Sequence, residues 1–489
     1  MKQLAILFIL LFLPGWQIGA QDASQVLADI LAGKGLITAD EHSRVAQAEP
    51  ETRVRILADL LLQKGILDKE EAETIASSRQ NAMAGGRMAP TGTLLLSLAP
   101  ASQTRPQIPP PSESQNPPPV SLYGTILWNG FYNTGPANNA DIPLLAPQRG
   151  SDPLSNFGMT VRQSRLGVRY QGSEIAGAKL TGQAEIDFFG GKAALANGMN
   201  MDLVRLRLGY LRLDWPLFSL LVGQDWSIFA PLNPTSLAGF AIPALSAAGN
   251  LWMRAPQIHA ELRRDLTDKV RFQWQIAAAD PNAGDYPAAF QTVRTPGIGE
   301  RGLMPGLESR LGLTLPMNGR QAVLGIGAHY NRGKNSTVSG GTQFNLPVDG
   351  WGVAIDYTLP VYRRLTLTGE FFEGRALGIF SASLGQAVLP VGTPGEHGVE
   401  TRGGWVQAQL SIASKWQANA AYGLEIPNSS ELRSGDRSKN QAYTANVMYK
   451  PSPNITFAWE WRRFLSNYKN LPAASNVSDH ANMAVGYVF

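Results

Sequence analysis

The sequence contains no cysteine, and this absence excludes disulfides, thiolate metal sites and cysteine nucleophiles together. Charged residues make up only 16% of the 489 residues, and the formal net charge is +4. A charge so small for a chain of this length gives no reason to expect a nucleic-acid partner. No apolar run reaches the ~18 residues that a membrane-spanning helix needs, so a helical membrane protein is excluded.

Catalytic signatures are also missing. The five histidines are scattered, and no glycine-rich phosphate loop or metal-ligand spacing accompanies them. His259 and His329 lie in strand-like segments, without a serine or carboxylate constellation near them in sequence. We therefore expect no catalytic residue, no cofactor and no bound metal.

Residues 1–20 have the pattern of a secretory signal peptide. Lys2 precedes the apolar run from Leu4 to Pro14, and small residues end at Ala20. The apolar run is too short to span a bilayer, and no cysteine follows it for lipid attachment. The sequence therefore predicts cleavage after Ala20 and export of the mature chain.

Residues 21–80 show helical periodicity and an internal repeat. Leu27-Ala28-Asp29 recurs as Leu57-Ala58-Asp59, an offset of 30 residues. Thr38 and Glu41 fit a capping box, and Asp68 with Glu71 forms its acidic relative in the second copy. This pattern predicts a small periplasmic module of two helical hairpins. Two roles remain open, namely a module that buries its own apolar stripe and one that docks to itself or to a periplasmic partner.

Residues 81–119 are rich in Pro, Gly, Ser and Gln, and they include two runs of three prolines. Such a composition cannot bury a core and partly favours polyproline II. We expect a semi-rigid linker here, with a domain boundary before residue 120.

From residue 120 to 489 the periodicity changes to that of strands. In the segment Val270–Ala278, Val270, Phe272, Trp274 and Ile276 alternate with polar residues. Alternation gives a strand one apolar and one polar face, and segments of this length can cross a bilayer when tilted. Sixteen such segments can be identified in this region.

The connections between these segments alternate in length. Short turns occur at Trp215–Pro216, Asp265–Lys269, Pro316–Arg320, Pro360–Arg363, Ala413–Lys415 and Lys450–Asn454. Long connections occur at 134–158, 190–201, 227–250, 280–307, 332–350, 375–399, 426–439 and 465–478. This regularity is typical of an all-β transmembrane antiparallel barrel, with short turns in the periplasm and long loops outside. It predicts a closed barrel of sixteen strands in the outer membrane.

The last segment predicts how the barrel closes. Phe489, Tyr487, Val485 and Met483 form one apolar row in a strand that ends on an aromatic residue. We expect this strand to pair with the strand that contains Tyr123. Nine aromatic residues are expected near the ends of lipid-facing rows, as interfacial girdles. They are Tyr123, Trp128, Trp274, Trp351, Trp416, Tyr422, Tyr443, Tyr449 and Trp459.

Two features predict the lining of the pore. The third long connection, Ser227–Asn250, contains no charged residue and is dominated by apolar side chains, including Phe229, Leu232, Leu237 and Phe240. We expect it to fold inward as a constriction, the alternative being that it packs at a trimer centre. The row opposite the lipid carries charged residues, which are expected to line the pore: Arg165, Arg169, Lys179, Glu185, Asp187, Arg205, Arg207 and Arg271.

The charges on the second to fourth strands predict the sign of the selectivity. Arg165, Arg169, Lys179, Arg205 and Arg207 outnumber Glu185 and Asp187. Unpaired guanidinium groups in a narrow lumen attract anions, especially carboxylates and phosphates. The alternative is that the arginines pair with the acids across the strands and only build the wall.

Several runs resemble the DcaP-like trimeric porins of Gram-negative bacteria. These runs are Ser164–Gly167, Glu185–Gly190, Arg205–Tyr210 and Val222–Ser227. The resemblance implies a homotrimeric diffusion channel that often favours small anionic solutes. A helical segment before the barrel also occurs in that family, although there it is of the coiled-coil type. A similar pre-barrel module occurs in phosphate-selective porins, which are the second family that this sequence resembles.

We therefore expect an outer-membrane porin through which small hydrophilic, anionic solutes diffuse passively. Its expected partners are outer-membrane lipid, these solutes, two further copies of the chain and, for the helices, a possible periplasmic protein. A barrel that mainly anchors the helical module is the first alternative, and an outer-membrane hydrolase is the second. Ion conductance in a planar bilayer separates a channel from an anchor.

Overall fold

The structure, a computed structural model, divides into two compact units, residues 1–96 and 97–489. The residues that it describes are 28–29, 32, 37–48, 56, 59–60, 62–64, 119–148, 154–191, 202–281, 284, 295–339, 342–390, 392–393, 398–471 and 476–489. The expected signal peptide, the Asp68–Glu71 cap and the linker up to residue 118 lie outside these ranges.

The first unit contains the helix α3 (Ala39–Gln47). The backbone N–H of Thr38 donates to Glu41 Oε2 at 2.7 Å, and the Thr38 hydroxyl accepts from the N–H of Glu41 at 3.3 Å. The predicted capping box is therefore confirmed. Lys64, from the second sequence copy, contacts Glu41 at 2.9 Å. None of the described helices is long and apolar enough to span a membrane.

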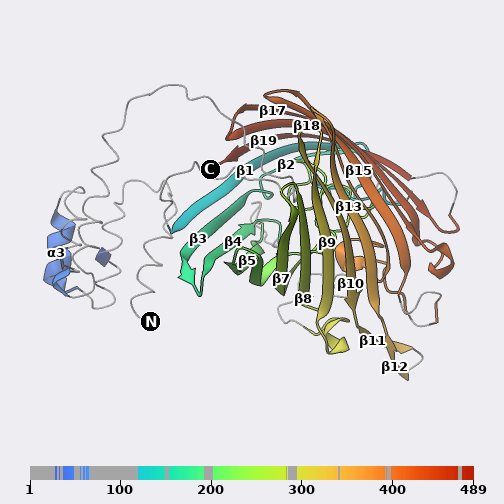
Figure 1. The fold of residues 1–489 in the computed structure, drawn as a ribbon, viewed down its shortest axis with the longest axis horizontal. Helices are drawn as coiled ribbons and strands as arrows, with labels where there is room; N and C mark the ends of the chain where they lie inside the picture. The colour runs from blue at the N-terminus through green and yellow to red at the C-terminus, as the bar shows by residue number, and fades with distance from the viewer. Residues whose placement is uncertain are drawn as a thin grey trace. The chain divides into compact units, whose positions relative to one another are not determined.

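The second unit is a β-barrel (Figure 1). Its strands are β1 (Val120–Asn133), β2 (Asn156–Thr160), β3 (Arg165–Ile175), β4 (Ala178–Asp187), β5 (Arg205–Asp214), β6 (Phe218–Trp226), β7 (Arg254–Thr267), β8 (Val270–Ala279), β9 (Gly306–Met317), β10 (Arg320–Asn331), β13 (Gly350–Tyr362), β14 (Leu365–Arg375), β15 (Glu400–Ala413), β16 (Trp416–Pro427), β17 (Arg437–Ser452), β18 (Ile455–Tyr468) and β19 (Asn476–Val488). A separate hairpin of β11 (Lys334–Ser339) and β12 (Thr342–Pro347) lies in the loop between β10 and β13.

The barrel has sixteen strands, as predicted. The sheet contains 17 segments, but β2 and β3 both pair with β1 and together occupy one strand position. All neighbours along the chain pair antiparallel, and the short connections fall at the predicted places, with a further one at Ala176–Gly177.

The barrel closes between its first and last strands, which lie side by side in Figure 1. Tyr487 lies opposite Ile126 in the ladder of β1 and β19. Phe489 follows β19 and exchanges backbone hydrogen bonds of 3.0 and 3.1 Å with Gly124. A Cβ atom at Gly124 would lie 2.5 Å from the Phe489 ring and 2.8 Å from the Arg165 carbonyl oxygen, so a larger residue would displace the terminal aromatic side chain or the β3 backbone. The predicted pairing is confirmed.

Side chains alternate between the two faces of the wall. On β10, Leu324 and Ile326 are exposed on the outside, whereas Gly325, Gly327 and His329 are buried inside. The same exposed apolar rows occur on the other strands, and among the expected girdle residues Trp274, Trp416, Tyr443 and Trp459 belong to them. Tyr123 was assigned wrongly, because it is only 3% exposed and faces inward, where its hydroxyl donates to Glu185.

Candidate functional site: a loop held inside the barrel

The connection between β6 and β7, residues 227–253, lies inside the barrel and is hereafter the inner loop. Most of its residues are buried, although a free loop of this length would be exposed. Inward-facing glycines leave space for its backbone. A Cβ atom at Gly327 would lie 2.2 Å from the Phe229 carbonyl oxygen, and one at Gly423 would lie 2.1 Å from the Ala248 carbonyl oxygen. The inner loop therefore lies directly on the wall.

The four apolar residues expected at the constriction pack against the wall rather than facing open water. Phe229 is fully buried against Phe380, with ring centroids 5.5 Å apart. Leu232 belongs to a buried cluster with Trp405, and Leu237 and Phe240 pack against Leu127 of β1. Burial of such side chains contributes about 1.5–3 kcal/mol each.

Carboxylates on three strands accept hydrogen bonds from the first half of the inner loop. Glu308 of β9 accepts from the Ser227 hydroxyl at 2.9 Å and from the N–H of Ile228 at 3.0 Å. Glu370 of β14 accepts from the N–H of Leu232 at 2.7 Å. We call these two residues and Glu460 the carboxylate arc.

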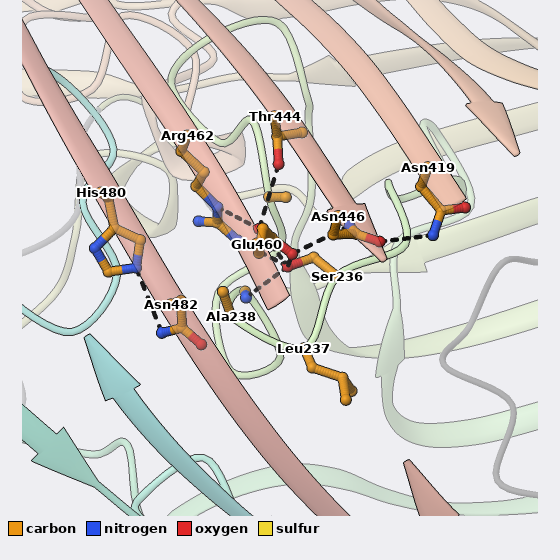
Figure 2. A network of polar contacts seen from close by, with 12 residues as sticks. Ser236, Leu237, Ala238, Asn419, Thr444, Asn446, Glu460, Arg462, His480 and Asn482 are labelled. Carbon is orange, nitrogen blue, oxygen red and sulfur yellow. Dashed lines mark hydrogen bonds and ion pairs between the residues drawn. The ribbon is translucent and has the colours of Figure 1, made fainter. Parts of the chain in front are cut away.

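The third member of the carboxylate arc is drawn in Figure 2. Glu460 of β18 accepts from the Ser236 hydroxyl at 2.7 Å and pairs with Arg462 at 2.6 Å. Thr444 and Asn446 of β17 also donate to it. Since all three members of the arc are 5% exposed or less, each bond forms where water offers little competition.

Side-chain donors from β1 to β5 bind the middle of the inner loop, residues 237–241, through its carbonyl oxygens. Asn129 donates to Leu237 at 3.2 Å, and Gln163 donates to Ala238 at 3.2 Å. Arg165 donates to Phe240, and Arg205 donates to Ala241 at 2.9 Å. We call Asn129, Gln163, Arg165 and Arg205 the donor arc. The uncharged loop is thus fastened by charged and amide groups of the wall.

Four of the predicted pore-lining residues come together in one cluster. Arg205 contacts Asp187 at 2.6 Å, and Arg207 contacts Glu185 at 2.7 Å and Asp187 at 3.0 Å. A bulge between β4 and β5 makes this possible, because Glu185 pairs with Leu208 and Ile186 with Leu206, which leaves Arg207 as the extra residue. Simple alternation in the sequence does not reveal such a bulge.

The remaining predicted pore-lining residues are placed differently. Arg165 lies over the Phe240 ring at 3.4 Å, and Arg169 lies over the Tyr123 ring at 4.1 Å. Lys179 is exposed near the turn at Ala176–Gly177. Arg271 is exposed at the turn between β7 and β8, where it pairs with Asp265 at 2.7 Å, and it does not join the cluster.

A buried trio superficially resembles a catalytic triad. Glu308 accepts from the Ser227 hydroxyl and lies 3.4 Å from His329 Nδ1. In a triad the histidine contacts the nucleophile, whereas here the serine donates to the carboxylate instead. His329 also packs edge-on against Phe380 at 4.8 Å. The arrangement fits an anchor for the loop.

Comparisons with known proteins place the fold. No protein-family model matches the chain, and no curated protein matches it in sequence. The channel DcaP of Acinetobacter baumannii is 18% identical with a TM-score of 0.57, covering 76% of this chain and 97% of that chain. An anion-selective porin from Comamonas acidovorans is 15% identical with a TM-score of 0.46, covering 76% and 99% respectively. The likeness to DcaP shows a common barrel fold, as the sequence resemblance predicts.

Proposed function

We propose that the protein is an outer-membrane porin through which small hydrophilic solutes diffuse. The supporting observation is a closed barrel that is apolar outside, polar inside and narrowed by an inner loop fastened to its wall. Exposed rows such as Leu324 and Ile326 would be costly in water but suit lipid. The likeness in fold to the DcaP channel agrees with this proposal.

A planar lipid bilayer tests this proposal. Purified protein should insert and give discrete, stable conductance steps in KCl. The main alternative is a filled barrel that anchors the N-terminal helices, and it is supported by the burial of the inner loop. Folded protein that inserts without conducting would favour the anchor.

We further propose a weak preference for small anions such as carboxylates or phosphorylated compounds. Arg205 and Arg207 have carboxylate partners, while Arg165 bonds a backbone carbonyl and Arg169 stacks on an aromatic ring. The positive surplus among these four arginines and the two acids therefore rests on Arg165 and Arg169, which lie outside the four-residue cluster. A cation that no carboxylate neutralises attracts anions into a narrow lumen.

The reversal potential in a KCl gradient tests the preference. Replacing Arg165, Arg205 and Arg207 together by Ala should shift it toward K⁺, because Glu185 and Asp187 then lose their partners. Arg271→Ala is the matched control, since this arginine pairs with Asp265 at a turn. An unchanged potential in the triple variant would mean that the cluster only builds the wall.

The assembly and location of the chain are part of the proposal. An apolar hollow of about 860 Å³ lies over β1, β2 and β14–β19, where the small residues Gly130, Ala418, Ala420 and Ala481 leave room between larger side chains. Such a surface suits close contact with further copies in a homotrimer. We place the N-terminal helices in the periplasm, where they would dock to a partner protein. Cross-linking in isolated outer membranes would test both points.

A further inference from the structure

A second hollow lies between the first part of the inner loop and the wall. Its volume is about 100 Å³, and β5 to β10 form its floor while residues 227–233 form its roof. Since a water molecule occupies about 30 Å³ of the liquid, the space corresponds to about three waters. It therefore admits a small solute.

Both arginines that line this cavity are paired with carboxylates, so they add no net positive charge to it. Arg310 makes a bidentate pair with Asp356, at 2.8 and 2.6 Å. Arg212 binds Asp214 at 2.9 Å and lies 3.6 Å from Glu261. The third charged side chain in the lining is an acid, Asp225. An anion in this cavity would meet paired cations and a carboxylate, so the charges disfavour it.

The polar lining nevertheless has hydrogen-bonding capacity to spare. The Gln273 amide has no hydrogen-bond partner within the part of the chain that the structure describes. Gln275 lies 3.4 Å from both His259 and Arg310, at the long limit of a hydrogen bond. An amide offers both donors and an acceptor, and a neutral imidazole offers one of each. These groups match a hydroxyl group, which donates and accepts at once.

The roof supplies an apolar surface. Ile228 and Leu232 of the inner loop face the cavity, and Trp226 and Val323 complete its apolar part. A ligand with hydroxyl groups along one side and C–H groups along the other satisfies both surfaces.

We propose that this cavity binds a small neutral polyol of two or three carbons. The proposal rests on the proposed function only in that solutes reach the cavity through the lumen. The Gln273 amide, with His259 and Gln275, bonds the hydroxyl groups, and Leu232 and Val323 contact the carbon chain.

Saturation-transfer NMR on the full chain in a detergent without sugar head groups tests this proposal. Glycerol should give a signal that excess ethylene glycol suppresses, whereas mannitol should be too large to compete and acetate should fail to compete. Gln273→Met should weaken the signal at least tenfold. This variant removes no hydrogen bond of the folded wall, because the amide makes none among the described residues.

The matched control is Gln321→Met, on β10 two positions before Val323 and outside the cavity lining. Val323→Phe provides a second variant, because its ring fills the space; heat-modified migration on a gel verifies that each barrel folds. An unchanged signal in both cavity variants would overturn the proposal, as would competition by acetate. The NMR experiment measures binding and not transport. A protein that binds glycerol without conducting ions would contradict the proposed porin function alone, and a protein that conducts ions without binding glycerol would contradict the polyol site alone.

Discussion

The inner loop is held by two arcs of the wall that use opposite chemistry. The carboxylate arc accepts from N–H and hydroxyl groups between Ser227 and Ser236. The donor arc gives its hydrogen bonds to carbonyl oxygens between Leu237 and Ala241. A loop without charges of its own is therefore fastened mainly to acceptors over residues 227–236 and mainly to donors over residues 237–241. Exceptions include Gln163, which also accepts from the N–H groups of Phe240 and Ala241, and Asn446, which donates to the Thr235 carbonyl.

The carboxylates of one arc and the amides of the other should differ in the strength of their hydrogen bonds to the inner loop. A hydrogen bond to a charged group contributes about 1.5–3 kcal/mol, and a neutral one about 0.5–1.5 kcal/mol. Three carboxylates form one arc, whereas the other combines the neutral amides of Asn129 and Gln163 with the charged guanidinium groups of Arg165 and Arg205. Loss of carboxylates should therefore free the loop more than loss of amides.

The largest effect is expected from Glu308→Ala combined with Glu370→Ala. These changes leave the donors of Ser227, Ile228 and Leu232 buried without acceptors, at a cost of about 1–3 kcal/mol each. We expect larger and noisier single-channel conductance and a lower thermal midpoint. Asp265→Ala at an exposed turn is the control. Channels with the conductance and the current noise of the unchanged protein would show that the carboxylate arc does not hold the loop.

A substitution at Gly423 tests the close contact between the inner loop and the barrel wall. In Gly423→Val, the new Cβ atom would lie 2.1 Å from the Ala248 carbonyl oxygen, so the loop must move away from β16. Overpacking of this kind costs about 1–3 kcal/mol. Thermal unfolding and conductance should both change, while Gly135→Ala, with open space around it, should change neither. Equal behaviour of the two variants would contradict the close packing.

A smaller effect is expected from Gln163→Leu in the donor arc. Gln163 is fully buried, donates to Ala238 and accepts from the N–H groups of Phe240 and Ala241 at 2.9 Å. Its loss should increase hydrogen exchange around Phe240 while leaving the Ile228 region protected, and conductance should change less than in the double variant. A larger change than in the double variant would reverse the proposed ranking of carboxylates and amides.

Much of the barrel follows from the sequence because its signals are local. Alternation along each strand and the lengths of the connections predict the strand number, and the C-terminal row predicts closure onto the strand that contains Tyr123. The absence of charge between Ser227 and Asn250 indicates a buried loop. These properties depend on neighbouring residues, so one sequence contains them.

The partners of the inner loop could not be predicted in this way. Glu460 meets Ser236 across 224 positions of the chain, and no local pattern connects them. The bulge beside Ile186 places Arg207 next to Glu185, and strand alternation alone does not indicate it. The wrong assignment of Tyr123 has another cause, namely the assumption that an aromatic residue near a strand end faces lipid. Inward glycines such as Gly327 and Gly423 are the signal that could have indicated where a backbone approaches the wall.

The smallest effect concerns the same kind of hydrogen bond, from a backbone N–H to a glutamate carboxylate, at an exposed position. Glu41 accepts from the N–H of Thr38 at 2.7 Å in the capping box of α3, as Glu370 does from Leu232 in the barrel. The bond from Thr38, followed by the contact with Lys64, lowers the pKa of Glu41 below its usual value. Because the folded form has the lower pKa, the stabilisation is fully present above the pKa of the unfolded chain. It is lost as the pH falls through the pKa of the folded form.

Hydrogen exchange of residues 37–48 in the full chain measures this effect, after correction for the intrinsic dependence of exchange on pH. Protection should be constant at neutral pH and should decrease as the pH falls below the usual glutamate range, because the Glu41 carboxylate then becomes protonated. Glu41→Gln should reduce protection at neutral pH and remove most of this dependence, while Asp40→Asn, one position before the cap partner, should retain it. Because water competes for this exposed bond, its loss should affect exchange far less than the loss of Glu370 affects the inner loop. A dependence that persists unchanged in Glu41→Gln would assign the acid sensitivity of α3 to a group other than the capping carboxylate.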